Sequence, residues 1–393
     1  MHRISRFIAL FALALLLVSC STQGVPVETG KPCEAGSFTV VDDFTGARRG
    51  ACTVLSKNRV KLKIVPEDQR VRNPSPWYAF KLVPNDGIQA RVVLDYGSWK
   101  HRYWPKISTD GKTWRLLDAN NIRGEPKDSS IELLIPLDTV SVWVSAQEIL
   151  TPADYKGWDA ATAKNTDAEL SVLGRSAAGR PIYLLDSGGN AGRVVLLTGR
   201  QHPPEVSGAY AFTRFTEVVL GDTPLAQQFR EQFRVLAIPL LNPDGVALGH
   251  WRHNLGSIDL NRDWGPFTQP ETQLVAGLLD TLDNHGAEVM AFIDFHSTDR
   301  NVFYTQTDDE GFRLPGFEKT WLDRARQRIE NYPFERSARL TSEQANGKNY
   351  MFKRYGIPSL TYEVGDETPH GTAAAAAIVF AEEFMQLMLE VAP

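Results

Sequence analysis

The sequence has 393 residues, of which 42% are hydrophobic and 23% are charged. These proportions are typical of globular domains with substantial cores, and the length favours two or three domains. The net charge of −5 gives no support to nucleic acid or an anionic membrane surface as a partner, so we expect neither.

The N-terminus has the pattern of a secretory signal. Basic residues within the first six positions precede an apolar run over residues 7–18, and small polar residues follow it. The run is too short for a membrane span, which needs about 20 residues. We therefore expect residues 1–19 to be a signal peptide and residues 20–35 to be a tether.

Residues 17–20, Leu-Val-Ser-Cys, resemble the bacterial lipobox, in which Cys20 becomes the lipidated first residue. Ser21, in place of an Asp, favours the outer membrane. The resemblance implies a protein of the bacterial cell envelope that is lipid-anchored in the outer membrane and faces the periplasm. The alternative is a cleaved signal followed by an incidental cysteine.

The cysteine count agrees with export. Of three cysteines, Cys20 would carry lipid, which leaves Cys33 and Cys52 as a possible disulfide pair. An oxidising compartment permits that bond, and two unpaired thiols are the alternative.

Residues 36–150 contain short segments in which apolar and polar residues alternate, separated by turn signals such as Asn85-Asp-Gly. Several short strands at this spacing predict an antiparallel β-sandwich. The expected strands lie at 38–41, 60–65, 90–96, 131–135 and 140–144.

After a connector at 151–165, residues 166–393 alternate between strand and helix patterns. This alternation predicts an α/β domain with a mixed, largely parallel sheet. The expected strands lie at 179–185, 194–197, 233–240, 289–295 and 359–364, and the expected helices at 209–220, 272–285, 317–332 and 372–391.

Polar side chains follow three of these strands. His202 and Glu205 come on a proline-stiffened loop after the strand at 194–197. His296 directly follows the strand at 289–295, and Glu363 lies near the end of the strand at 359–364. Sites in α/β sheets form beyond the carboxyl ends of the strands. Two His and one Glu suit a single catalytic zinc ion with a fourth position for water, whereas a lone His at a strand end is usually structural.

Glu363 is placed to act as a general base. Three further residues, Arg252, Asn261 and Arg262, lie between Glu205 and His296 in the sequence and make a possible anion pocket. The alternative for the two arginines is surface ion pairing with an aspartate. Asp259, Asp263 and Asp280 are the candidates for such pairing.

Five motifs together resemble the zinc metallocarboxypeptidases related to carboxypeptidase A. They occur in the family's order over about 160 residues. The motifs are His202-Pro-Pro-Glu205, Asn242-Pro-Asp-Gly, Arg252 with Asp259-Leu-Asn261-Arg262, Asp294-Phe-His296-Ser, and Glu363. Segments at 77–80 and 100–106 resemble the β-sandwich that precedes the catalytic domain in the cytosolic-carboxypeptidase-like branch.

The resemblance implies a role for each matching residue. His202, Glu205 and His296 match the ligands of one zinc ion, and Glu363 matches the general base. Arg252 matches the group that polarises the scissile carbonyl. Asn261 and Arg262 match the pair that binds the substrate's terminal carboxylate, and Asp259 matches a carboxylate that orients a ligating histidine.

One feature departs from the family pattern. A Tyr usually lies about twenty residues before the base on a mobile loop, and Ser342 or Glu343 falls there in this chain. Tyr350 is too close to Glu363 to replace it. The resemblance therefore does not say which residue of this chain would close over the substrate.

The loop that shapes the terminal side-chain pocket is expected to include Lys348 and Asn349. A lysine there would favour acidic C-terminal residues, unless it points into solvent. We expect a carboxypeptidase acting on peptides or peptidoglycan stem peptides. A murein-peptide amidase or an N-acyl amino acid deacylase could use the same zinc site, and a non-catalytic envelope-binding protein is a third alternative.

Overall fold

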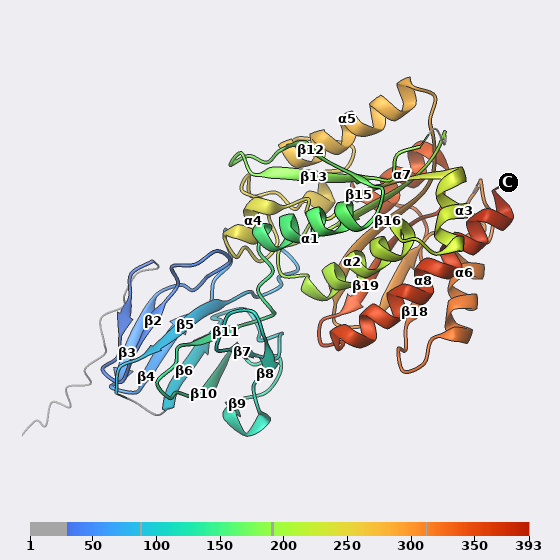
Figure 1. The fold of residues 1–393 in the computed structure, drawn as a ribbon. Helices are drawn as coiled ribbons and strands as arrows, with labels where there is room; N and C mark the ends of the chain where they lie inside the picture. Colours follow the sequence, from blue (N-terminus) through green and yellow to red (C-terminus); the bar gives the residue numbers. More distant parts are fainter. Residues whose placement is uncertain (1–29, 87–88, 190–191, 312, 393) are drawn as a thin grey trace, which may run out of the picture.

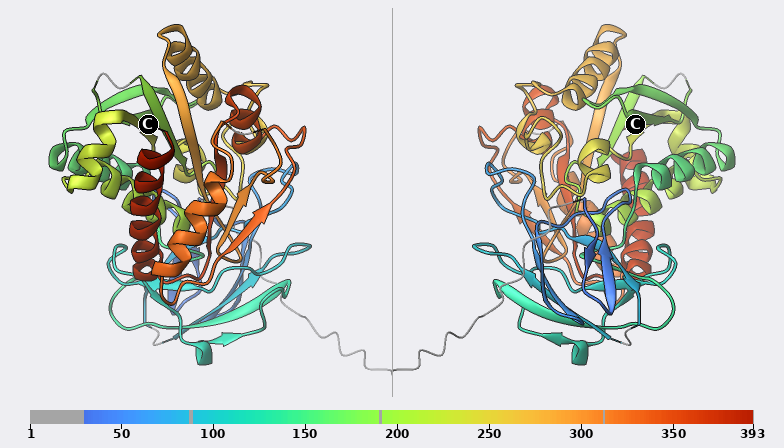
Figure 2. Two further views of the ribbon diagram at one scale, coloured as in Figure 1. Left: turned by 90° about the vertical axis from the view of Figure 1, so that its right-hand side faces the viewer. Right: turned by 90° about the vertical axis from the view of Figure 1, so that its left-hand side faces the viewer.

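A computed structural model describes residues 30–86, 89–189, 192–311 and 313–392. The proposed signal peptide and Cys20 lie outside the described residues. Two domains follow each other along the chain, and the N-terminal sandwich packs against one end of the α/β domain (Figures 1 and 2). The predicted order, a β-sandwich and then an α/β domain, is confirmed.

The N-terminal domain consists of two sheets in the orders β1-β2-β5-β11-β7-β8 and β3-β4-β6-β10-β9. All pairs are antiparallel except β4 with β6, which is parallel. In β6 and β10 every second side chain is buried, as alternation predicts. The strands are β1 (Cys33–Glu34), β2 (Phe38–Val41), β3 (Cys52–Ser56), β4 (Arg59–Lys63), β5 (Ala79–Pro84), β6 (Gln89–Asp95), β7 (Lys106–Ser108), β8 (Arg115–Leu116), β9 (Ile122–Arg123), β10 (Ser130–Pro136) and β11 (Val142–Ser145).

A disulfide joins Cys33 and Cys52, as the cysteine count predicts. The bond connects β1 in one sheet to β3 in the other. It therefore links the two layers of the sandwich covalently.

The segment at 151–165, which the pattern analysis treats as a connector, forms the helix α1 (Pro152–Asn165). Thr151 and Asp154 make a reciprocal capping box at its start, and Pro152 occupies the first turn. This helix packs against β12 and β13. The first helix of the α/β domain therefore begins within the expected connector.

The α/β domain is built on an eight-stranded sheet in the order β12-β13-β15-β14-β16-β19-β17-β18. Its four central strands run parallel, and antiparallel pairs flank them on both sides. The predicted mixed, largely parallel sheet is confirmed. The strands are β12 (Glu169–Arg175), β13 (Pro181–Asp186), β14 (Arg193–Gly199), β15 (Phe233–Ile238), β16 (Glu288–Thr298), β17 (Val302–Thr305), β18 (Glu335–Ala338) and β19 (Ser359–Gly365).

Helices cover both faces of this sheet (Figure 1). α2, α3, α6 and α8 pack together on one face, and α5 and α7 cover the other. α8 is long and apolar enough to cross a membrane, but more than half of its apolar stretch is buried in the core. The remaining helices are α2 (Val206–Leu220), α3 (Pro224–Gln232), α4 (Pro243–Ala247), α5 (Pro270–Asn284), α6 (Phe317–Arg328), α7 (Gly347–Tyr355) and α8 (His370–Val391), with short 3₁₀ turns η1 (Ala119–Asn121) and η2 (Leu260–Arg262).

Candidate active site

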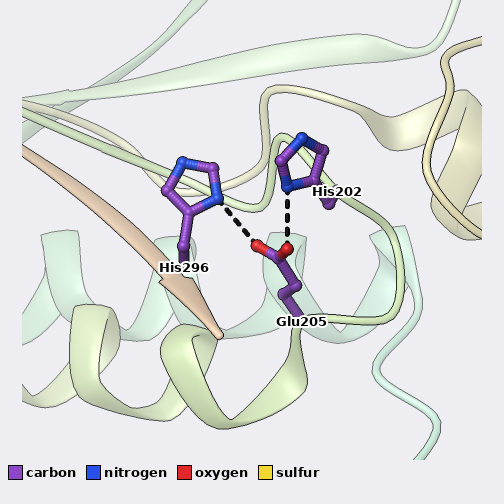
Figure 3. Close-up of side chains that lie close together, drawn as sticks. All are labelled: His202, Glu205 and His296. Carbon is purple, nitrogen blue, oxygen red and sulfur yellow. Dashed lines mark hydrogen bonds and ion pairs between the residues drawn. The ribbon is translucent and has the colours of Figure 1, made fainter. Parts of the chain in front are cut away.

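Three side chains meet at the carboxyl end of the central strands. β14 ends at Gly199, the loop after it carries His202, and Glu205 lies directly before α2. His296 comes from the neighbouring strand β16. The two imidazole rings flank one carboxylate, with His202 Nδ1 2.8 Å from Glu205 Oε1 and His296 Nδ1 2.7 Å from Oε2 (Figure 3).

The far nitrogen of each ring is held by another carboxylate. His202 Nε2 lies 2.9 Å from Asp259 Oδ1, and His296 Nε2 lies 2.8 Å from Asp294 Oδ2. Asp294 itself accepts hydrogen bonds from Thr198 Oγ1 and Gln201 Nε2. These contacts orient both Nδ1 atoms toward the space around Glu205.

This donor set fits a zinc ion. One imidazole nitrogen from each histidine and a Glu205 oxygen lie within 4.8 Å of one another, and all three residues are buried. Two imidazole nitrogens and one carboxylate are the protein ligands typical of a catalytic zinc, and carboxylates behind the histidines are typical of such sites. His202, Glu205 and His296 would therefore hold the ion.

A second group of possible ligands is engaged in hydrogen bonds. Glu67, Asp68 and His253 also lie within 4.8 Å of one another. The carboxylate of Glu67 accepts three backbone N–H bonds, however, and Asp68 Oδ2 lies 2.9 Å from His253 Nδ1. Hydrogen bonds account for this cluster.

Glu363 lies beside the three candidate ligands. It is paired in register with His296 across β19 and β16, so both side chains project from the same face of the sheet. Its Oε2 atom is buried and has no hydrogen-bond partner among the described residues. Burial raises the pKa of Glu363 to about 7. The nearby His296 partly opposes this rise in pKa, and the charge of Glu205 adds to it.

Arg252 forms an ion pair with Asp259, as the alternative interpretation allows. Its Nε donates to Asp259 Oδ2 at 2.6 Å. The pair is not on the surface, because Arg252 is only 6% exposed and lines the same cavity as Glu363. Asp259 thus contacts both Arg252 and His202.

Asn261 and Arg262 lie on η2, at the edge of the site. Asn261 Nδ2 is 3.3 Å from His296 Nε2, and its Oδ1 accepts a hydrogen bond from the Gly347 backbone N–H. Arg262 forms no ion pair with Asp263 or Asp280 among the described residues. Asp263 accepts hydrogen bonds from residues 268–272, and Asp280 pairs with Arg354.

A cavity of about 450 Å³ brings these groups together. Basic side chains from three parts of the chain line it. Its walls also include residues that the sequence did not identify as site residues. Asn73, Ser75 and Arg102 reach it from the sandwich, and Tyr304, Arg339 and Thr361 line it from the α/β domain. Although Arg102 lies in a segment that resembles the family's sandwich, no motif marks any of these six as a site residue, because the tertiary fold alone brings them to the site.

The candidates for the position of the usual Tyr lie in different surroundings. Ser342 lines the cavity, whereas Glu343 is exposed and pairs with Lys353. Tyr350 packs against Trp264 and Phe267, away from the cavity lining.

Lys348 and Asn349 both line the cavity at the start of α7. Lys348 is buried, and its Nζ donates to the Thr305 carbonyl at 3.3 Å. Burial lowers the pKa of this lysine, and Glu318 partly opposes the effect. The lysine therefore points inward rather than into solvent.

Comparisons with curated proteins find cytosolic carboxypeptidases. Cytosolic carboxypeptidase 2 of Xenopus tropicalis is 33% identical over 163 residues, which cover 37% of this chain and 16% of the relative. Cytosolic carboxypeptidase 6 of Mus musculus is 31% identical over 159 residues, covering 37% of this chain and 29% of the relative. The chain thus matches less than a third of the length of these relatives.

Solved bacterial structures share the fold over nearly the whole described chain. A metallo-carboxypeptidase from Burkholderia cenocepacia has a TM-score of 0.74 at 17% identity, covering 90% of this chain and 99% of that one. One from Pseudomonas aeruginosa has a TM-score of 0.73 at 19% identity, with coverages of 90% and 99%. The family model described as zinc carboxypeptidase matches residues 156–377, more than half of the sequence. The resemblance drawn from the motifs is confirmed, and this chain belongs to the zinc carboxypeptidase family.

Proposed function

We propose that this protein is a zinc-dependent carboxypeptidase that hydrolyses the C-terminal amide bond of peptides. One observation carries the proposal. A three-residue ligand set and an unpaired, buried carboxylate open into a cavity lined by several basic side chains. This combination suits a substrate that has both a scissile amide and a terminal carboxylate.

Each residue has a proposed task. When bound, zinc supplies Lewis acidity, which polarises a carbonyl and lowers the pKa of a water molecule. Glu363 accepts a proton from the attacking water on its free Oε2 and then delivers it to the nitrogen of the leaving amine. The scissile C–N bond breaks as the new C–O bond is retained.

The basic side chains bind the charged parts of the substrate. Arg252 donates to the carbonyl oxygen as negative charge develops there, an interaction that is strongest in the transition state. Asn261 and Arg262 bind the terminal carboxylate, for which a guanidinium offers two parallel donors. Only a peptide with a free C-terminus satisfies both sites.

Substitution of Glu363 by Gln tests the reaction. We expect Glu363→Gln to retain zinc, at about one ion per chain, and to lose activity by at least about 100-fold, because general bases typically contribute 10²–10⁴-fold. Release of the last residue would be measured on peptides with free and with amidated C-termini. Glu343→Gln is the matched control, since Glu343 is exposed, and it should behave as wild type.

Other outcomes would favour the alternatives. Bound metal without peptide trimming would indicate a murein-peptide amidase or an N-acyl amino acid deacylase, which murein fragments and N-acyl amino acids would identify. Equal activity on amidated peptides would argue against a carboxypeptidase. Absence of bound metal would contradict the proposed enzymatic activity and favour an envelope-binding protein.

We propose a preference for acidic C-terminal residues. Lys348 and Arg339 both line the cavity and provide positive charge for a Glu or Asp side chain. We expect Lys348→Ala to lower the ratio of activities on Glu-ended and Leu-ended peptides by about tenfold, since charged hydrogen bonds contribute about 1.5–3 kcal/mol. Lys353→Ala, an exposed change on the same helix, should leave the ratio unchanged, and an unchanged ratio in Lys348→Ala would refute the preference.

We also propose a lipid-anchored location in the outer membrane, facing the periplasm of a bacterial cell. The disulfide between Cys33 and Cys52 supports an oxidising compartment. Peptidoglycan stem peptides are therefore plausible substrates, and the lipid on Cys20 would be the membrane contact. Labelled fatty acid should enter the wild type but not Cys20→Ser, and incorporation into both would refute the site.

A further inference from the structure

The segment that carries Arg252 is held by the other domain. It follows α4, where the chain turns at Gly249 with φ +63°. A Cβ at this position would lie 2.8 Å from the Gly46 carbonyl of the sandwich, so glycine permits the close approach. Residues 251–253, which follow shortly after, contact the sandwich.

Glu67, on the loop after β4, binds the backbone of this segment. Its Oε2 accepts the Trp251 N–H at 2.7 Å, and its Oε1 accepts the N–H groups of Arg252 and His253 at 3.0 and 2.6 Å. The Glu67 side chain is only 3% exposed. Three consecutive backbone donors thus converge on one buried carboxylate.

The side chains on either side of Arg252 add to this attachment. Trp251 is fully buried in the sandwich core, and its Nε1 donates to the Trp77 carbonyl at 2.9 Å. His253 Nδ1 lies 2.9 Å from Asp68 Oδ2. The backbone of Arg252 is therefore fixed to the sandwich on both sides.

The guanidinium of Arg252 contacts both domains, and its Nη1 donates to the Asn73 carbonyl of the sandwich at 3.4 Å. Its Nε donates to Asp259, which also contacts His202. The sandwich therefore holds the backbone of Arg252, and the guanidinium bridges the sandwich and Asp259 of the α/β domain. The orientation of the domains consequently sets where the guanidinium meets the substrate carbonyl.

We propose that Glu67 is a positioning residue for Arg252. Through Glu67, the sandwich determines where the Arg252 side chain lies in the active site. The inference rests on the proposed function, in which Arg252 stabilises the developing oxyanion. A small misplacement of such a donor costs up to about 100-fold in rate. Glu67 is not among the residues that line the cavity, so we expect its effect to pass through the segment that carries Arg252.

Glu67→Gln tests the inference in the full chain. One amide nitrogen would then face a backbone donor, which removes at least one of the three hydrogen bonds. Glu148→Gln is the control, because Glu148 also bridges the domains, to Tyr210 and His370, but away from Arg252. Hydrogen exchange over residues 250–254, kcat and KM would be measured for each variant with and without Arg252→Ala.

We expect Glu67→Gln to speed exchange over 250–254 and to lower kcat about 10- to 100-fold with little change in KM. In the Arg252→Ala background it should lower kcat no further. Unchanged exchange, an unchanged kcat, or an equal additional loss without Arg252 would each overturn the inference. If the wild type trims no peptide, the proposed function fails. Hydrogen exchange over residues 250–254 then tests by itself whether Glu67 holds the segment.

Discussion

At the residue scale, the two histidines differ in how firmly they are held. His296 is backed by Asp294, which receives two further hydrogen bonds from Thr198 and Gln201. His202 is backed by Asp259, which is shared with Arg252. Asp294 contacts the imidazole of His296 but not that of His202. A change at Asp294 therefore isolates the effect of the His296 ring orientation on metal binding.

We expect Asp294→Asn to weaken zinc binding by about 10- to 100-fold, because the partner of a ligating histidine sets its tautomer and orientation. The affinity would be measured by competition with a chromophoric chelator. Asp299→Asn, which lies near the end of the same strand and is largely exposed, is the control. An unchanged affinity in Asp294→Asn would show that the second nitrogen needs no carboxylate.

At the element scale, the start of α2 is pressed against the strand that carries His296. A Cβ on Gly208 would lie 2.2 Å from the His296 carbonyl oxygen. The Gly208 N–H also donates to Ser297 Oγ at 2.7 Å. A glycine is therefore required for α2 to approach β16 closely enough to place Glu205 and His296 together.

We expect Gly208→Ala to lower the free energy of unfolding by about 1–3 kcal/mol, because the added methyl group overlaps backbone that has little room to move. Gly277→Ala is the matched control in α5, where a Cβ would meet no atom within 4 Å. That substitution should be neutral or stabilising by up to about 1 kcal/mol. Chemical denaturation measures both, and a neutral Gly208→Ala would contradict the close packing.

At the scale of the whole molecule, the sandwich is more than an appended domain. It contributes Asn73, Ser75 and Arg102 to the cavity, and it buries Trp251 from the α/β domain in its core. The disulfide between its two sheets stabilises this platform. Loss of sandwich structure should therefore affect the site as well.

We expect the double variant Cys33→Ser and Cys52→Ser to lose about 3 kcal/mol of stability, since the bond closes a loop with a sequence separation of 19. Thermal unfolding should show a lower Tm than that of the oxidised wild type. Reductant should lower the Tm of the wild type but not that of the double variant. Equal Tm values in all four samples would contradict the stabilising role.

The two-domain order and the groups most directly tied to chemistry can be predicted from local sequence patterns. Hydrophobic alternation identified the sandwich, and alternating strand and helix patterns identified the mixed sheet. His202, Glu205, His296 and Glu363 could be found because parallel strands bring their carboxyl ends to one edge. Helix α1 was missed although its signal, the capping box of Thr151 and Asp154, is local and readable.

The rest of the site depends on how the chain folds in three dimensions. Glu67 and Arg102 belong to the sandwich, more than a hundred residues before the groups they approach, and no local pattern marks them as site residues. The direction of Lys348 also depended on the fold, because either a buried or an exposed lysine suited the sequence. Local periodicity encodes elements and their faces, whereas a site between domains depends on how two finished surfaces pack together.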